Sequence, residues 1–181
     1  MRSVARCDER GSEEIVGYIL TRVHSEQGTR AEGSGDLVIG IGTDLIEIER
    51  IAHSVERFGD AFLRRIYTPG EIAYCQRKKN AAESLAARFA AKEAGAKALG
   101  TGISRGVGWR EFEVRRLPGQ RPELHLSGRA AEVAEGLGIR RISLSLAHSQ
   151  GLSIAVVVAE DQAQHRDDRR LHPNQNNSPR D

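Results

Sequence analysis

The chain has 181 residues, 39% of them hydrophobic and 4% aromatic, and a formal net charge of +2 at pH 7. Its length suits one domain of about 100–150 residues with appended segments. The near-neutral charge excludes a protein that binds nucleic acid or another polyanion over its whole surface. No apolar run approaches the roughly 20 residues that span a bilayer, so we expect no transmembrane helix.

Features of the two ends predict a cytoplasmic protein with one central domain. The start, MRSVARCDERGSEE, lacks the apolar stretch of a signal peptide. Cys7 and Cys75 have no metal-ligand spacing, which is typical of reduced, cytosolic thiols. Residues 1–35 predict a short helix and a flexible linker, and the polar residues 161–181 predict a disordered tail. The domain is therefore expected over residues 36–160.

The first predicted element of the domain is a buried strand in LVIGIGTDL (37–45), which we expect to end near Thr43 and Asp44. Apolar residues at helical spacing then predict a helix that stops at Gly59. The segment DAFLRRIY (60–67) predicts a second, shorter helix. The chain is thus expected to pass from its first strand directly into two helices.

The rest of the domain continues with helices and then turns to strands. Thr68 as N-cap and Pro69 as first helical residue predict a further helix, and a long alanine-rich helix follows from about Glu83 to Leu99. The remaining elements are two hairpin strands, a helix closed by a glycine and two apolar strands, at 111–117, 123–127, 128–138, 141–146 and 152–159. This order predicts an α+β fold with a largely antiparallel sheet.

The alanine-rich helix carries charges that invite a functional interpretation. Glu93 and Lys97 are four residues apart and share one face, although an ordinary exposed ion pair has the same spacing. The small alanines allow another backbone or a ligand to approach closely. The loop of Gly100, Thr101 and Gly102 could offer backbone N–H groups to a phosphate as an anion-binding nest. A glycine C-cap followed by a turn is the alternative.

Asp44 and His148 are further candidates. A carboxylate at a strand end beside glycines can hold a hard cation such as Mg²⁺, which takes one or two protein carboxylates, here Asp44 with Glu93. The alternative for Asp44 is the N-cap of the following helix. His148 is expected in a polar turn between the last two strands, where it could donate a hydrogen bond to a phosphate or simply be a surface residue.

Four segments together resemble the holo-[acyl-carrier-protein] synthase family of the 4′-phosphopantetheinyl transferase superfamily. They are GIGTDLIEIERI (40–51), ARFAAKEAGAKALGTGI (87–103), GQRPELHLSGRA (119–130) and SLSLAHS (143–149). The first two, with the long helical spacer between them, are the most specific. The resemblance covers about residues 37–159 and implies the fold of that family.

The resemblance implies roles for individual residues. Asp44 and Glu93 match the carboxylates that bind Mg²⁺, and Lys97 matches a lysine near the pyrophosphate of coenzyme A. Arg88 and His148 match groups near its 3′-phosphate. The matched loop beside the cofactor consists of Gly100, Thr101 and Gly102. The matched basic surface that meets acidic acyl carrier protein begins at Arg50 and extends to Arg57 and Arg65. One departure is Ala147, where the family usually has serine.

The implied reaction transfers 4′-phosphopantetheine from coenzyme A to a serine of apo-acyl carrier protein, in fatty acid biosynthesis. A water on the metal or Glu93 could take the serine proton. Family members of this short type are trimers with the active site between protomers. Because Arg88 and Glu93 are five residues apart and point about 140° away from each other on a helix, we expect adjacent protomers to share each site.

Two other classes of protein compete with this interpretation. A different Mg²⁺-dependent phosphoryl transferase is disfavoured because the sequence has no P-loop or kinase motif. A binding module whose basic helix 47–57 docks on nucleic acid is disfavoured by the near-neutral charge and the aromatic content of 4%.

Overall fold

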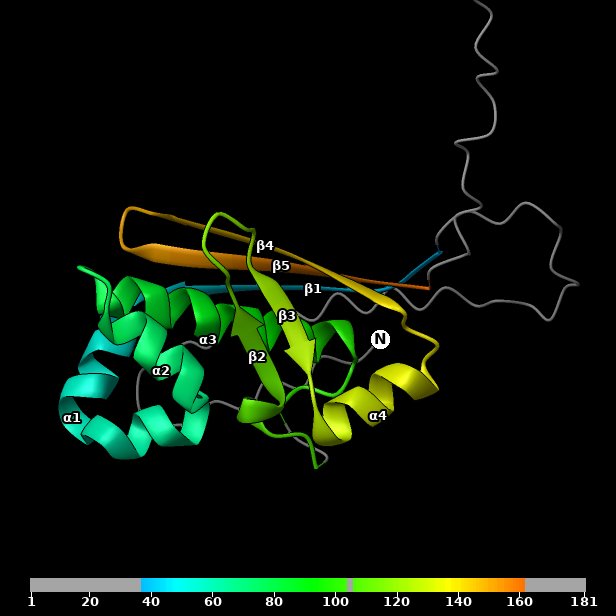
Figure 1. Ribbon diagram of the computed structural model, residues 1–181, viewed down its shortest axis with the longest axis horizontal. Coiled ribbons are helices and arrows are strands. Elements are labelled where there is room, and N and C mark those ends of the chain that lie inside the picture. Colours follow the sequence, from blue (N-terminus) through cyan, green and yellow to red (C-terminus); the bar gives the residue numbers. More distant parts are fainter. Residues whose placement is uncertain (1–36, 104–105, 162–181) are drawn as a thin grey trace, which may run out of the picture.

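The computed structural model describes residues 37–103 and 106–161 (Figure 1). Most of the two predicted appended segments, 1–35 and 161–181, therefore lies outside the described residues. The elements are β1 (Leu37–Glu47), α1 (Ile48–Ile66), α2 (Pro69–Gln76), α3 (Ala81–Ala98), the short 3₁₀ helix η1 (Trp109–Glu111), β2 (Phe112–Arg115), β3 (Glu123–Leu126), α4 (Gly128–Gly136), β4 (Arg141–Ser149) and β5 (Leu152–Asp161).

Two antiparallel sheets enclose the central helix α3. The larger sheet has the strand order β1-β5-β4, and the smaller one is the hairpin β2-β3. Figure 1 shows α3 along one face of the larger sheet, with α1 and α2 together at one end and α4 near the other. The predicted α+β fold with an antiparallel sheet is confirmed. None of the helices in the part of the chain that the structure describes is long and apolar enough to cross a membrane.

The strand β1 lies directly on α3. A methyl group added at Gly42 would overlap the carbonyl oxygen of Ala94, and one at Gly40 would overlap that of Ala98. Two glycines and two alanines therefore bring the two backbones into contact. The sequence interpretation, in which the alanines admit a ligand or a second chain, needs correction here, because β1 of the same chain takes this space.

The two faces of the larger sheet differ in their cover. The inner face packs on α3, and its residues Ala155 and Val157 are buried. The outer face is apolar but open: Ile41 is 55% exposed, Leu45 59% and Ile154 39%. Ile41 and Leu45 belong to β1 and Ile154 belongs to the neighbouring strand β5, where it pairs with Leu45.

The predicted end of β1 is wrong, and so is the alternative that Asp44 caps the following helix. β1 continues to Glu47, so Asp44 lies within the ladder opposite Ala155 and does not end the strand. Pairing with the long strand β5, which no local pattern reveals, extends it. The N-cap of α1 is therefore Glu47, not Asp44. The predicted stop at Gly59 is confirmed, because Gly59 is non-helical (φ 53°) and divides α1 into the two predicted helices.

Later elements follow the prediction more closely. Thr68 caps α2 with its side chain, and Pro69 is the first residue of that helix, as predicted. The last two strands are present, but β4 continues to Ser149, so His148 belongs to a strand and not to a turn. The turn consists of Gln150 and Gly151, both with positive φ, which suits a two-residue hairpin connection.

Candidate active site

Asp44 and Lys97 form a partly exposed ion pair at the junction of β1 and α3. Lys97 Nζ donates to Asp44 Oδ1 over 2.9 Å and to the carbonyl oxygen of Thr43 over 3.1 Å. The two side chains are 16% (Lys97) and 15% (Asp44) exposed, so a small ligand can reach them. Asp44 follows Gly42 on the same face of β1, and the backbone contact at Gly42 therefore sets the spacing of the pair.

The electrostatics of this pair favour a cation beside Asp44. Partial burial raises the pKa of the Asp44 carboxyl above its usual 3.8, and the nearby charges of Lys97 and Arg50 oppose that rise. A carboxylate withdrawn from water in this way gains most from a positive partner. Lys97 supplies that partner within the single chain.

Glu93 lies on the same helix as Lys97. It is half-buried and precedes Lys97 by one helical turn, so both side chains leave α3 on neighbouring positions of one face. The residues fit Mg²⁺, because two carboxylates supply hard oxygen ligands and Mg²⁺ completes its shell with water and substrate oxygens. No cluster of three or more potential metal ligands occurs within residues 37–103 and 106–161.

Arg88 and His148 both contact residues of the first turn of α3, at the other end of that helix. Arg88 Nη1 donates to the carbonyl oxygen of Ser84 over 3.1 Å. His148 Nε2 lies 3.0 Å from Glu83 Oε1. The structure therefore separates the five predicted residues into two groups along α3, with Arg88 and His148 near its start and the other three near its end.

Arg88 is largely enclosed by its own chain. The residue is 4% exposed, and its guanidinium lies 4.3 Å from the centre of the Tyr74 ring. Its Nε is buried and has no hydrogen-bond partner among the described residues. An unpaired buried donor is costly, so an anion that reached it would be bound strongly. Such an anion needs Tyr74 to move aside.

The loop after α3 is a helix cap and not an anion-binding nest. The N–H of Gly100 donates to the carbonyl of Lys97, and the N–H groups of Thr101 and Gly102 both donate to the carbonyl of Ala96. The positive φ of Gly100 and Gly102 permits this arrangement. The nest interpretation is wrong and the capping alternative is confirmed, because the backbone donors already serve the helix. The position of this loop beside a cofactor stays a prediction.

The predicted basic surface on α1 is only partly assembled. Arg50 and Arg57 line one open groove of about 400 Å³ together with the exposed Phe58. Arg57 stacks on Phe58, with its guanidinium carbon 5.0 Å from the ring centre. Arg65 lies on α1 beyond the break at Gly59 and does not line this groove.

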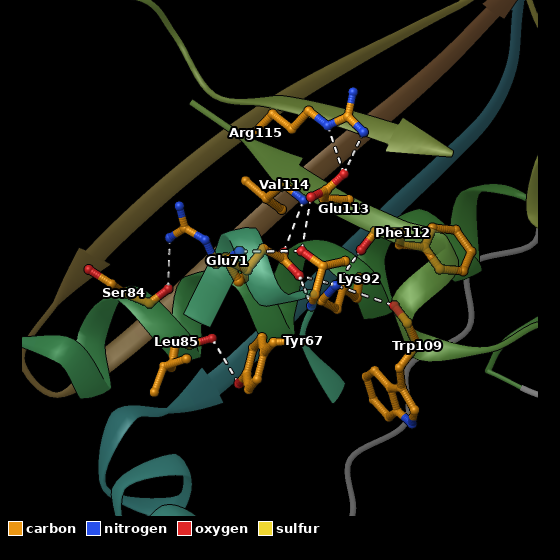
Figure 2. Close-up of polar contacts among 12 residues, drawn as sticks. Tyr67, Glu71, Ser84, Leu85, Lys92, Trp109, Phe112, Glu113, Val114 and Arg115 are labelled. Atoms are coloured by element: carbon orange, nitrogen blue, oxygen red, sulfur yellow. Dashed lines mark hydrogen bonds and ion pairs between the residues drawn. The ribbon is translucent and has the colours of Figure 1, made fainter. Parts of the chain in front are cut away.

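Sequence reasoning missed a second lysine–carboxylate pair, which Figure 2 shows at the centre of a polar network. Lys92 Nζ donates to Glu71 Oε2 over 2.8 Å and also to the carbonyls of Trp109 and Phe112. The other Glu71 oxygen accepts the N–H of Val114 over 3.0 Å. Burial lowers the pKa of Lys92, and Glu71 opposes that change. This pair joins α2, α3 and β2.

One hollow on the surface of the described residues lies apart from all of these groups. Its volume is about 700 Å³, and β3, α4 and β4 line it. None of the predicted site residues lines it. Because Asp44, Glu93 and Lys97 do not line it, we place the candidate active site at the junction of β1 and α3 and not in this hollow.

Comparison with known proteins identifies the class. Residues 40–157 match the 4′-phosphopantetheinyl transferase superfamily, and the chain belongs to that family. The predicted family and the prediction of an enzyme are thereby confirmed.

The relatives narrow the comparison further. The holo-[acyl-carrier-protein] synthase of Koribacter versatilis (strain Ellin345) is 56% identical over 125 residues, which cover 69% of this chain and 100% of the relative. That of Chlamydia trachomatis serovar L2 is 46% identical over 123 residues, 68% of this chain and 100% of the relative.

Solved structures agree with the sequence relatives. The holo-[acyl-carrier-protein] synthase of Neisseria meningitidis superposes with a TM-score of 0.62 at 40% identity and covers 68% of this chain and 98% of its own. The Helicobacter pylori enzyme in complex with coenzyme A gives 0.59 at 37% identity, covering 66% and 98%.

Proposed function

We propose that the protein transfers the 4′-phosphopantetheine group of coenzyme A to a serine of apo-acyl carrier protein, in the cytoplasm and within fatty acid biosynthesis. The observation that carries this proposal is the Asp44–Lys97 pair, because it combines an anion and a cation at a reachable junction of β1 and α3. The names of the relatives and the coenzyme A complex of the Helicobacter pylori enzyme support the two substrates.

The reaction exchanges one bond to phosphorus for another. The serine oxygen forms a bond to the β-phosphorus of the pyrophosphate, and the bond from that phosphorus to the bridging oxygen breaks. The bridging oxygen leaves with the electron pair on adenosine 3′,5′-bisphosphate. Lys97 donates a hydrogen bond where this negative charge grows. Glu93 is the candidate acceptor that this chain offers for the serine proton.

Asp44 and Glu93 are the residues that would hold Mg²⁺. When bound, the ion supplies positive charge that neutralises the pyrophosphate. Lys97 donates a hydrogen bond to Asp44 within the chain. With Mg²⁺ beside Asp44, the ammonium of Lys97 would turn toward the substrate. The same lysine would therefore pair with Asp44 before coenzyme A binds and assist the leaving group during transfer.

We further propose that the protein is a homotrimer whose sites lie between protomers. The open apolar face of the larger sheet supports this assembly, because exposed apolar patches of this kind mark interfaces. The distribution of residues along α3 supports shared sites. Arg88 and Lys97 are nine residues apart, about 14 Å along the helix, which is too far for one compact phosphate cluster.

Two experiments test these proposals. Incubation with coenzyme A and apo-carrier protein should add the mass of one phosphopantetheine to the carrier, and an unchanged mass would refute the activity. For the shared site, inactive Glu93→Ala and Arg88→Ala proteins are mixed under conditions of subunit exchange. Partial recovery of activity is expected, since some interfaces carry both intact halves. No recovery despite verified exchange would show that each site lies within one chain.

A further inference from the structure

Glu83 holds His148 from the first turn of α3. Its Oε1 lies 3.0 Å from His148 Nε2, and its Oε2 accepts a hydrogen bond from Asn80 Nδ2 over 3.0 Å. Asn80 is the N-cap of α3, and its own side-chain oxygen accepts the N–H of Glu83. Both carboxylate oxygens therefore have partners, and the helix start fixes their direction.

This contact does little for stability. The side chains of His148 and Glu83 are 56% and 30% exposed, and ion pairs at such positions contribute weakly to folding. The N-cap bond needs only the backbone N–H of Glu83. The main effect of the contact is therefore on the orientation of the His148 imidazole.

The contact determines which ring nitrogen faces outward. A carboxylate only accepts hydrogen bonds, so His148 Nε2 carries the proton that points to Glu83. Nδ1 is then the nitrogen left for a ligand. A phosphate accepts a hydrogen bond at Nδ1 only from a ring that carries protons on both nitrogens, so Glu83 would accept at Nε2 and the phosphate at Nδ1.

Ser84, the next residue along the helix, binds the guanidinium of Arg88. Ser84 accepts the hydrogen bond of Arg88 Nη1 through its carbonyl, so successive residues of one helical turn orient His148 and Arg88. We propose that Glu83 is a positioning residue that presents His148 to the 3′-phosphate of coenzyme A. This inference rests on the proposed function and adds the residue that determines recognition of that phosphate.

The test compares coenzyme A with dephospho-coenzyme A, which lacks the 3′-phosphate. Glu83→Gln keeps an oxygen for Asn80 and removes the charge that faces His148. We expect its Kd for coenzyme A, measured by calorimetry, to rise about tenfold, as for loss of one charge-assisted hydrogen bond. Its Kd for dephospho-coenzyme A and its kcat should not change. Glu132→Gln, which loses an exposed ion pair to Arg129, is the matched control.

Two further measurements isolate the route through His148. The double variant Glu83→Gln with His148→Gln should bind coenzyme A no more weakly than His148→Gln alone. The ¹⁵N NMR signals of the His148 ring should report a protonated Nε2 in the wild type and lose that preference in Glu83→Gln. Additive losses in the double variant, or an unchanged ring, would overturn the inference.

The outcomes also separate this inference from the proposed function. If the wild type modifies carrier protein but Glu83→Gln weakens both coenzyme A forms equally, the positioning role is wrong and the activity stands. If the wild type binds both forms equally well, no site for the 3′-phosphate exists and the inference is again wrong. Absence of transfer by the wild type would overturn both.

Discussion

Two lysine–carboxylate pairs on α3 have nearly the same length and opposite settings. Lys92 and Glu71 are 2.8 Å apart with 0% of either side chain exposed, whereas Lys97 and Asp44 are 2.9 Å apart and partly open to solvent. The donors of Lys92 are all directed at protein acceptors, namely one carboxylate and two carbonyls. The N–O distance therefore does not distinguish the structural pair Lys92–Glu71 from the candidate reactive pair Lys97–Asp44. Exposure to solvent does.

The largest expected effect concerns the open pair and its neighbour. Asp44→Ala or Glu93→Ala should abolish transfer and leave the fold intact, because each change removes a ligand that Mg²⁺ can hardly replace. Carrier-protein mass measures the activity, and circular dichroism measures the fold. Wild-type turnover in either variant, or of the wild type in excess EDTA, would refute the metal role.

The closed pair should respond in the opposite way. Lys92→Met leaves the Glu71 carboxylate buried without its cation, so we expect the free energy of unfolding to fall by about 3–5 kcal/mol. Lys97→Met, the matched change in the partly exposed pair, should cost less stability because solvent can reach Asp44, and yet remove most activity. Urea unfolding monitored by fluorescence measures both. Equal losses of stability would show that exposure to solvent does not distinguish the two pairs.

A smaller effect is expected at the docking surface. Arg50→Glu and Arg57→Glu should weaken binding of the acidic carrier protein strongly, with coenzyme A binding nearly unchanged and added salt mimicking the defect. Arg65→Glu should have less effect, because Arg65 lies outside the groove that the other two line. Surface plasmon resonance measures the carrier affinity. Equal loss of affinity for both substrates would make Arg50 a structural residue.

The smallest effect should follow removal of the ends. Residues 1–35 and 161–181 contain none of the predicted site residues. A chain restricted to about residues 36–160 should therefore fold and retain its activity. Turnover per folded molecule is the measurement. A folded but inactive chain would assign a function to one of the removed segments.

The elements that depend on local chemistry were predictable. Thr68 before Pro69 determines the start of α2 through hydrogen bonds within one turn. The hairpin of β2 and β3 follows from alternating residues around a glycine turn. In each case the interacting residues are near one another in sequence, so the pattern carries the information.

Features that depend on distant partners were not predictable in the same way. The continuation of β1 past Asp44 requires pairing with β5, more than a hundred residues later. Lys92 resembles a surface charge of a helix, and only the packing of α2 and β2 around it reveals a buried pair. The roles of Asp44, Glu93 and Lys97 came from family resemblance, because spacing alone allowed an ordinary ion pair and an N-cap.

The contact between β1 and α3 also bears on how this enzyme can vary. Since backbone touches backbone at Gly40 and Gly42, peptide geometry sets how closely the two elements that carry Asp44 and Lys97 approach each other. A single methyl group on Gly42 would push the strand away and part Asp44 from Lys97. The proposed docking residues Arg50 and Arg57 lie on α1, outside this contact. They can therefore diverge to suit a new carrier protein while the spacing of Asp44 and Lys97 stays constant.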